Sequence, residues 1–220
     1  MRAVAIALGC LAAVTTITPV LAGGQSQLGD PKASAEQAFW GQLYASGGSS
    51  LYCAKSFDQN HGQLMPSPVY PSKQIKSALR CVTEAQCLAA NPQYPYMLAD
   101  LHNLYPELTR VELARRSAQF GNLGADVPSK LEAIGCDLKS SFQLVEPRDA
   151  AKGNVARAIF YMHIEYGLPI VGQLQMFKQW HQIDPPDAEE QARNQQIASL
   201  QGTRNRFIDD PSQVELLIKD

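Results

Sequence analysis

The sequence predicts an α+β protein that is mainly helical and folds as a single domain. Its 220 residues, 45% of them hydrophobic, suit one globular core. From Arg148 onward, apolar residues recur at helical spacing, whereas the earlier part of the chain shows only short strand patterns between proline- and glycine-containing segments. The chain contains no internal repeat and no sign of a second domain.

The first 22 residues have the pattern of a secretory signal. Arg2 supplies the charge, residues 3–20 are apolar, and Val20-Leu-Ala22 offers small residues for cleavage. A retained membrane anchor is the alternative, and the Thr-Thr-Ile-Thr-Pro interruption disfavours it. We therefore expect a periplasmic or secreted protein with no membrane contact after cleavage, and a monomer. The expected division is a signal peptide (1–22), a disordered polar segment (23–33), the folded domain (34–211) and a C-terminal tail (212–220).

Charge excludes one class of function. Loss of residues 1–22 removes one arginine and no acid, which leaves 18 basic and 21 acidic side chains and a net charge of −3. A protein that coats DNA by bulk attraction needs a positive surface. Any binding of nucleic acid must therefore depend on local clusters of basic residues.

Four cysteines remain after Cys10 leaves with the signal: Cys53, Cys81, Cys87 and Cys136. An even number in an oxidising compartment predicts two disulfides, for which three connectivities are possible. A zinc site is disfavoured because the chain has no Cys-x-x-Cys pair and no matching histidine pair.

The first half of the chain alternates short elements with loops. Pro68–Pro71 is expected to be extended, because each proline disfavours helical geometry in the residue before it. The other expected elements are a helix over Ser34–Ala45, a strand over Leu51–Cys53, a loop over Lys55–Pro68 and a short helix over Ser72–Leu79.

The second half is expected to be helical after a loop (Asn122–Lys139) and a strand (Phe142–Val145). In the first long helix, Val155, Ile159, Met162 and Tyr166 form one apolar stripe, and Gly167 ends it. Two further helices follow, over Val171–Gln182 and over Pro185–Gln201, the latter with Asp184 as N-cap and Gly202 as its stop.

The organising stretch is Ala99-Asp-Leu-His-Asn-Leu-Tyr-Pro106. It has the pattern of a strand end, and Pro106 suits the first turn of a helix over Glu107–Ser117. Glu112 on that helix is either half of a small metal site or a solvated glutamate at an ordinary β–α corner.

Asp100-Leu-His-Asn-Leu-Tyr-Pro106 resembles the DLHNL-x-P signature of the bacterial endonuclease I family of secreted nucleases. Further matching motifs in the same order extend the resemblance over Phe39–Pro211. They are Leu51-Tyr-Cys53, Val69-Tyr-Pro71, Val145-Glu-Pro-Arg148, Lys152-Gly153, Ala156-Arg157, Phe160-Tyr-Met162, Gln201-Gly-Thr-Arg-Asn205 and Phe207. The resemblance implies a small ββα-metal (His-Me finger-like) core and the disulfides Cys53–Cys136 and Cys81–Cys87.

The resemblance also implies a catalytic set that this chain has not kept. In the family, a Glu-His pair ends the first strand and an asparagine on the following helix completes a magnesium site, while the histidine activates water. The corresponding positions hold Ser67, Pro68 and Glu112. Glu112 alone could still ligate Mg²⁺, and His61 is the candidate for a displaced base.

The remaining histidines have structural interpretations. His102, with Asp100 and Asn103, belongs to the family signature and is expected to brace the fold. His163 and His181 lie on helices and are expected to be structural or exposed.

Basic residues suggest where a phosphate could bind. Arg148 and Lys152 lie one turn apart at a helix N-terminus, where free N–H groups favour an anion, although Glu146 and Asp149 could instead neutralise them. The other candidates, which could equally be solvated surface charges, are Arg80, Arg110, Arg115 and Arg116. Such contacts read phosphate rather than bases, so binding of DNA or RNA would be independent of sequence.

Three hypotheses follow. The first is a secreted, magnesium-dependent endonuclease with a rearranged site that uses Glu112 and His61. The second is a catalytically inactive relative that retains a phosphate-binding groove and acts as a nucleic-acid-binding or interaction module. The third is a secreted scaffold without a role in nucleic-acid binding.

Overall fold

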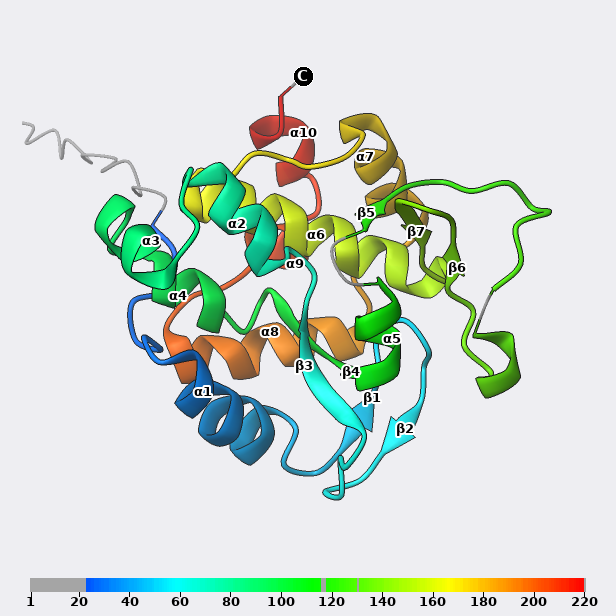
Figure 1. Ribbon diagram of the computed structural model, residues 1–220, viewed down its shortest axis with the longest axis horizontal. Helices are drawn as coiled ribbons and strands as arrows, with labels where there is room; N and C mark the ends of the chain where they lie inside the picture. Colours follow the sequence, from blue (N-terminus) through cyan, green and yellow to red (C-terminus); the bar gives the residue numbers. More distant parts are fainter. Residues whose placement is uncertain (1–22, 116–117, 130, 220) are drawn as a thin grey trace, which may run out of the picture.

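Short strands occupy the first two-thirds of the chain and long helices the last third (Figure 1). The structure is a computed structural model that describes residues 23–115, 118–129 and 131–219, so the expected signal peptide lies outside the described residues. In chain order the described elements are α1 (Pro31–Ala33), η1 (Ser34–Leu43), β1 (Gly48–Ser49), β2 (Ser56–Phe57), β3 (Leu64–Pro68), α2 (Ser72–Ala78), α3 (Glu84–Ala90), α4 (Tyr94–Ala99), β4 (Leu104–Leu108), α5 (Thr109–Arg115), β5 (Gln119–Phe120), η2 (Glu132–Ile134), β6 (Lys139–Ser140), β7 (Leu144–Glu146), α6 (Asp149–Tyr166), α7 (Leu174–Ile183), α8 (Ala188–Gln201), α9 (Arg206–Asp209) and α10 (Gln213–Leu217). The predicted α+β class is confirmed, and helix is far more abundant than strand.

The strands β3 and β4 form the antiparallel pair at the centre of the molecule, with Pro66 opposite Pro106. Prolines are tolerated here because each strand is an edge of a two-stranded sheet. The strand β3 replaces the end of the loop predicted over Lys55–Pro68, and Pro106 lies in β4 instead of in a helix.

The helix α5 begins at Thr109, so the predicted start at Glu107 is wrong, and its predicted end at Ser117 lies outside the described residues. The buried Glu107 carboxylate accepts hydrogen bonds from the backbone N–H groups of Tyr52, at 2.6 Å, and Leu108, at 2.8 Å. These bonds hold the segment extended through Leu108, which pairs with Leu64.

The predicted strand over Leu51–Cys53 is a buried turn in the structure, and the nearby strand is β1. The N–H of Ala54 donates to the carbonyl of Ser50, and Ala54 takes a φ of 50°, which closes the turn. The N–H of Leu51 donates to the Pro106 carbonyl and ties the turn to β4.

The two disulfides Cys53–Cys136 and Cys81–Cys87 are both present, as the resemblance implied. The first joins the turn at Cys53 to the segment before β6 over a sequence separation of 83 residues, whereas the second closes a separation of 6 residues between α2 and α3. In the three-stranded sheet, β7 lies between β5, which runs parallel to it, and β6, which runs antiparallel.

The C-terminal helices pack around α6, which ends at Gly167 with a φ of 65° as expected. The helix α8 also ends as predicted, at Gly202 with a φ of 78°, but it begins at Ala188. Its N-cap is Asp187 and not Asp184, because the Asp184 carboxylate accepts the N–H of Gly153 on α6 at 2.8 Å.

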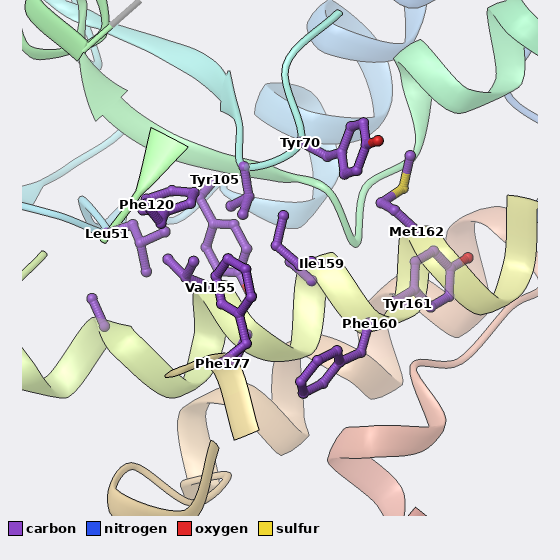
Figure 2. Packing of buried hydrophobic residues seen from close by; sticks show 14 of the residues in the cluster. Leu51, Tyr70, Tyr105, Phe120, Val155, Ile159, Phe160, Tyr161, Met162 and Phe177 are labelled. Atoms are coloured by element: carbon purple, nitrogen blue, oxygen red, sulfur yellow. The ribbon is translucent and has the colours of Figure 1, made fainter. Parts of the chain in front are cut away.

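The main core lies between α6 and the short strands. Figure 2 shows Val155 and Ile159 directed from α6 toward the side of the core that holds Leu51 and Tyr105, whereas Phe160 is directed to the opposite side. All five side chains are buried. The predicted apolar stripe is therefore real, but α6 is buried on more than that one face.

Both terminal segments differ from their predictions. Residues 23–33, expected to be disordered, pack against the domain: Gln25 is 1% exposed and its N–H donates to the Tyr166 hydroxyl. Residues 213–217 form α10 rather than a loose tail, with Val214 and Ile218 buried. Long-range polar contacts that composition does not reveal order the first segment, and apolar burial orders the second.

None of the described helices combines the length and the apolar character that crossing a bilayer requires.

Candidate nucleic-acid-processing site

The signature turn between α4 and β4 is built around a buried carboxylate. Asp100 accepts hydrogen bonds from the hydroxyls of Tyr161 (3.0 Å) and Tyr166 (2.6 Å) and from the Gln201 amide (2.8 Å). Burial raises the pKa of Asp100, because desolvation disfavours its charged form. The turn thus joins α4, the end of α6 and the end of α8.

His102 and Asn103 bond the same turn to backbone atoms. The His102 Nε2 atom donates to the Thr203 carbonyl at 3.1 Å, and burial lowers the pKa of His102 to about 3. The Asn103 side chain accepts the N–H of Tyr70 at 2.7 Å and donates to its carbonyl at 3.0 Å. These contacts bond both buried side chains to the backbone of neighbouring segments, as a bracing role requires.

Ser67 and Glu112, which the resemblance places at two positions of the family's metal site, lie in direct contact. Ser67 is buried near the end of β3, and its hydroxyl donates to Glu112 Oε2 at 2.5 Å. Arg115, one turn further along α5, donates from Nε to Oε2 at 3.1 Å and from Nη2 to Oε1 at 3.2 Å. Both oxygens of the Glu112 carboxylate are therefore already occupied by protein donors.

Arg115 is held deep in the structure. Its residue exposure is 1%, its Nη2 also donates to the Pro68 carbonyl at 2.5 Å, and its guanidinium lies 5.5 Å from the ring centre of Tyr52 and 5.6 Å from that of Phe120. Burial lowers the pKa of Arg115, but Tyr52 and Glu112 outweigh it and hold that pKa above its usual value.

A magnesium ion, which the resemblance implies, does not fit this arrangement. Mg²⁺ requires oxygen ligands at about 2.0–2.1 Å in octahedral geometry. Here Glu112 is shared between a guanidinium and a hydroxyl donor, and the fixed positive charge of Arg115 repels a second cation. No cluster of three or more histidine, cysteine or acidic side chains suited to a metal occurs among the described residues.

His61, the predicted displaced base, lies beyond the opposite end of β3. Its ring stacks on Trp40 with the ring centres 4.0 Å apart and the planes 3° apart, and its carbonyl accepts the N–H of Leu64. Ser67 lies six residues after His61 and three residues after Leu64, which is about 10 Å along the strand from Leu64. The contacts of Glu112 go to Ser67 and Arg115, so the structure does not bring His61 and Glu112 into contact.

The predicted phosphate-binding residues are not assembled into one basic surface. Lys152 is buried and bonds to Glu146 at 2.7 Å and to Asp149 at 2.8 Å, which is the neutralising alternative. Arg148 donates to the Leu51 carbonyl at 3.1 Å. Arg115 is buried, Arg116 lies outside the described residues, and Arg80 and Arg110 are exposed.

The histidines of the C-terminal helices have the structural contacts expected of them. His163 Nδ1 lies 2.7 Å from the Leu168 carbonyl, and His181 is buried with its Nε2 at 3.0 Å from the Pro211 carbonyl.

A groove with a volume of about 760 Å³ opens between α5 and the β6–β7 hairpin. Its lining residues are Lys73, Ala114, Arg115, Ala118, Gln119, Leu131, Leu138, Ser140, Ser141, Phe142, Gln143, Leu144 and Val145. The sequence analysis did not single out Lys73 or Phe142. The available signal was a lone aromatic residue among serines and glutamine, but a strand was predicted there, which would have turned alternate side chains inward.

Comparisons with known sequences agree with the resemblance seen in the motifs. The sequence model of the Endonuclease I family matches residues 41–212. A periplasmic deoxyribonuclease of Aeromonas hydrophila is 28% identical over 196 residues, which cover 76% of this chain and 81% of that protein. An extracellular deoxyribonuclease of Aeromonas hydrophila is 29% identical over 148 residues, or 64% of this chain and 63% of the relative.

A third relative matches this chain over a shorter stretch. An extracellular ribonuclease of Bacillus amyloliquefaciens is 34% identical over 131 residues, or 51% of this chain. The match covers only 44% of the length of the ribonuclease. The family model, in contrast, matches most of the chain, and the signature turn lies inside the matched range. The chain belongs to the endonuclease I family.

Proposed function

We propose that this protein is a secreted or periplasmic member of the endonuclease I family that binds nucleic acid and does not hydrolyse it at the Ser67–Glu112 site. The observation that carries the proposal is the Arg115–Glu112 pair, in which one guanidinium engages both carboxylate oxygens. Without a free carboxylate, the site has no ligand set for a divalent ion that would stabilise charge on the phosphate.

The lack of a base at position 68 supports the same proposal. Proline has no side-chain acceptor, and a general base must lie within hydrogen-bond reach of the attacking water, about 2.6–3.2 Å or one bridging water away. The neighbouring Ser67 hydroxyl donates to Glu112, and a neutral hydroxyl is too weakly basic to take a proton from water. His61, stacked on Trp40, has its ring engaged elsewhere.

Family membership supports a nucleic-acid ligand and a location outside the cytoplasm. The relatives are named as deoxyribonucleases and ribonucleases that are periplasmic or extracellular. The two disulfides suit an oxidising compartment. Binding through phosphate contacts would be independent of sequence, and it would weaken as salt displaces the protein from the phosphate backbone.

The test is plasmid nicking by the purified, oxidised protein, with magnesium and with EDTA, beside a repaired variant that carries S67E, P68H and E112N. We expect no cleavage by the unaltered protein, together with salt-sensitive binding of the same plasmid in a mobility-shift assay. Cleavage by the repaired variant would show that the fold can still present a substrate.

A control variant, H61A, identifies the source of any activity. Magnesium-dependent nicking by the unaltered protein that disappears in H61A would overturn the proposal in favour of a displaced base. Binding that is absent at low salt would also contradict it, since a nucleic-acid-binding role would then have no support.

A further inference from the structure

Phe142 is an exposed aromatic side chain at the rim of the groove beside α5. It is 95% exposed and is the one aromatic residue among the described large apolar side chains that are well exposed, the others being Val82, Leu88, Leu113, Ile183 and Leu216. Leaving a phenylalanine in water forgoes the free energy that its burial would supply. At the edge of a groove, such a ring leaves its π-face free to stack on a ligand.

Three interactions fix the hairpin that carries Phe142: a turn hydrogen bond, strand pairing and a disulfide. The N–H of Ser141 donates to the Leu144 carbonyl at 2.9 Å and closes the turn around Phe142. The strand β7 is paired with both β5 and β6, and Cys136, just before β6, is bonded to Cys53. The ring is therefore presented by a fixed turn rather than by a free loop.

The groove wall is chemically suited to a polyanion. Among the described residues that line the groove there is no aspartate or glutamate, although the chain as a whole has more acidic than basic residues. Lys73 on α2 is exposed on the rim and has no ion-pair partner in the part of the chain that the structure describes. Ser140, Ser141 and Gln143 add hydroxyl and amide groups that can bond to phosphate or sugar oxygens.

The groove adjoins the Ser67–Glu112 site through Arg115, which lines the groove and bonds to Glu112. Ala114 and Arg115, which line it, belong to the same short helix as Glu112. A strand that follows the groove from α5 to the hairpin therefore leads from the Ser67–Glu112 site to Phe142. In the view of Figure 1, α2 lies to the upper left of α5, and the strands β6 and β7 lie to its upper right.

We propose that this groove binds single-stranded nucleic acid, with an unpaired base stacked on Phe142 and a backbone phosphate on Lys73. The proposal rests on the nucleic-acid-binding function proposed above and names its surface and substrate class. Single strands fit because a duplex covers the faces of its bases, whereas an unpaired base offers a π-face to an aromatic side chain. DNA and RNA share this chemistry.

The test is fluorescence anisotropy of the purified, oxidised protein with labelled oligothymidylate, oligouridylate and a blunt DNA duplex of the same length. The F142A variant is expected to bind both single strands about 5- to 150-fold more weakly, the range for one lost stacking contact, with unchanged duplex binding. F142Y keeps an aromatic face and is expected to restore binding. K73Q is expected to reduce the slope of log affinity against log salt by about 0.7, the value for one phosphate contact on a single strand.

L216A provides a matched control, since it removes another exposed apolar side chain outside the groove. Equal single-strand affinity of F142A and the unaltered protein would overturn this inference and leave the proposed function standing. Failure of the unaltered protein to bind any of the three ligands would overturn both. Equal losses in F142A and L216A would also overturn it, because surface hydrophobicity would then explain the effect.

Discussion

At the scale of single residues, Arg115 decides what the Glu112 carboxylate can bind. A glutamate at position 112 alone would remain an acceptable metal ligand. The adjacent guanidinium converts that glutamate into half of a largely buried ion pair, with side-chain exposures of 0% for Arg115 and 13% for Glu112. This pair was not predicted, because the sequence shows a three-residue spacing on a helix but not which side of the helix is buried.

Removal of Arg115 should destabilise the fold strongly. In R115M the Glu112 carboxylate and the Pro68 carbonyl lose their charged donor, and breaking a buried pair typically costs about 3–5 kcal/mol of unfolding free energy. Urea denaturation measures this loss, and the double variant E112Q/R115M should recover part of it. R110M, on the exposed side of the same helix, is the control and should change stability by about 0.5 kcal/mol or less.

His102 should make stability depend on pH. Its pKa is lowered to about 3 in the fold, whereas the ordinary value is 6.5, so on acidification the unfolded chain takes up a proton that the folded protein does not. This contribution is complete above pH 6.5 and is lost as pH falls toward 3, with a slope of at most about 1.4 kcal/mol per pH unit.

The variant H102Q keeps a donor for the Thr203 carbonyl and removes the titration. Urea denaturation of both proteins between about pH 7 and pH 4 should therefore give a shallower fall for H102Q. Parallel curves would show that His102 does not titrate differently in the two states. His181, whose pKa burial also lowers, retains part of the acid sensitivity in the variant.

At the scale of elements, the sequence predicted the long helices well and the central strands poorly. The ends of α6 and α8 follow from glycines at positions 167 and 202, which take positive φ values that local sequence signals. The strand β3 could not be recognised, because prolines at positions 66 and 68 ordinarily indicate a loop. Its pairing with β4 depends on a partner some forty residues away, which no local pattern reveals.

The two disulfides should contribute unequally. In the chain-entropy model, closing a loop of 83 residues stabilises by about 4.5 kcal/mol, and closing one of 6 residues by about 2.2 kcal/mol. Urea midpoints of C53A/C136A and C81A/C87A test the order, and the first pair should cause the larger loss. A larger loss in the second pair would indicate that local packing around α3, rather than loop entropy, decides the effect.

At the scale of the whole molecule, segments distant in sequence meet at the C-terminal end of α6. The N–H of Gly24 donates to the Glu165 carbonyl, Gln25 contacts Tyr166, and Tyr166 in turn donates to Asp100. The polar, glycine-rich composition of the N-terminal segment predicted disorder, because such a segment buries little apolar surface. Composition does not reveal the long-range hydrogen bonds that order the segment. The family signature thus depends on residues outside the range expected to fold.

The variant Q25A tests this dependence. The Gln25 amide donates to the carbonyls of Leu28 and Tyr96 and accepts two backbone N–H groups, so its loss leaves buried groups without partners. We expect a loss of about 1–3 kcal/mol in unfolding free energy by urea denaturation. The neighbouring S26A, at an exposed position, should have no measurable effect, and equal behaviour of the two would mean that the segment is not docked in solution.

Because Arg115 is part of the chain, the positive charge beside Glu112 is present in a fixed one-to-one ratio at every ion concentration. A protein outside the cytoplasm meets surroundings whose magnesium content it does not control. A metal-built centre is filled or empty according to that supply, whereas a centre balanced by its own guanidinium has one composition throughout. The fold of this protein should therefore be indifferent to chelators: its thermal midpoint in EDTA and in magnesium should be the same.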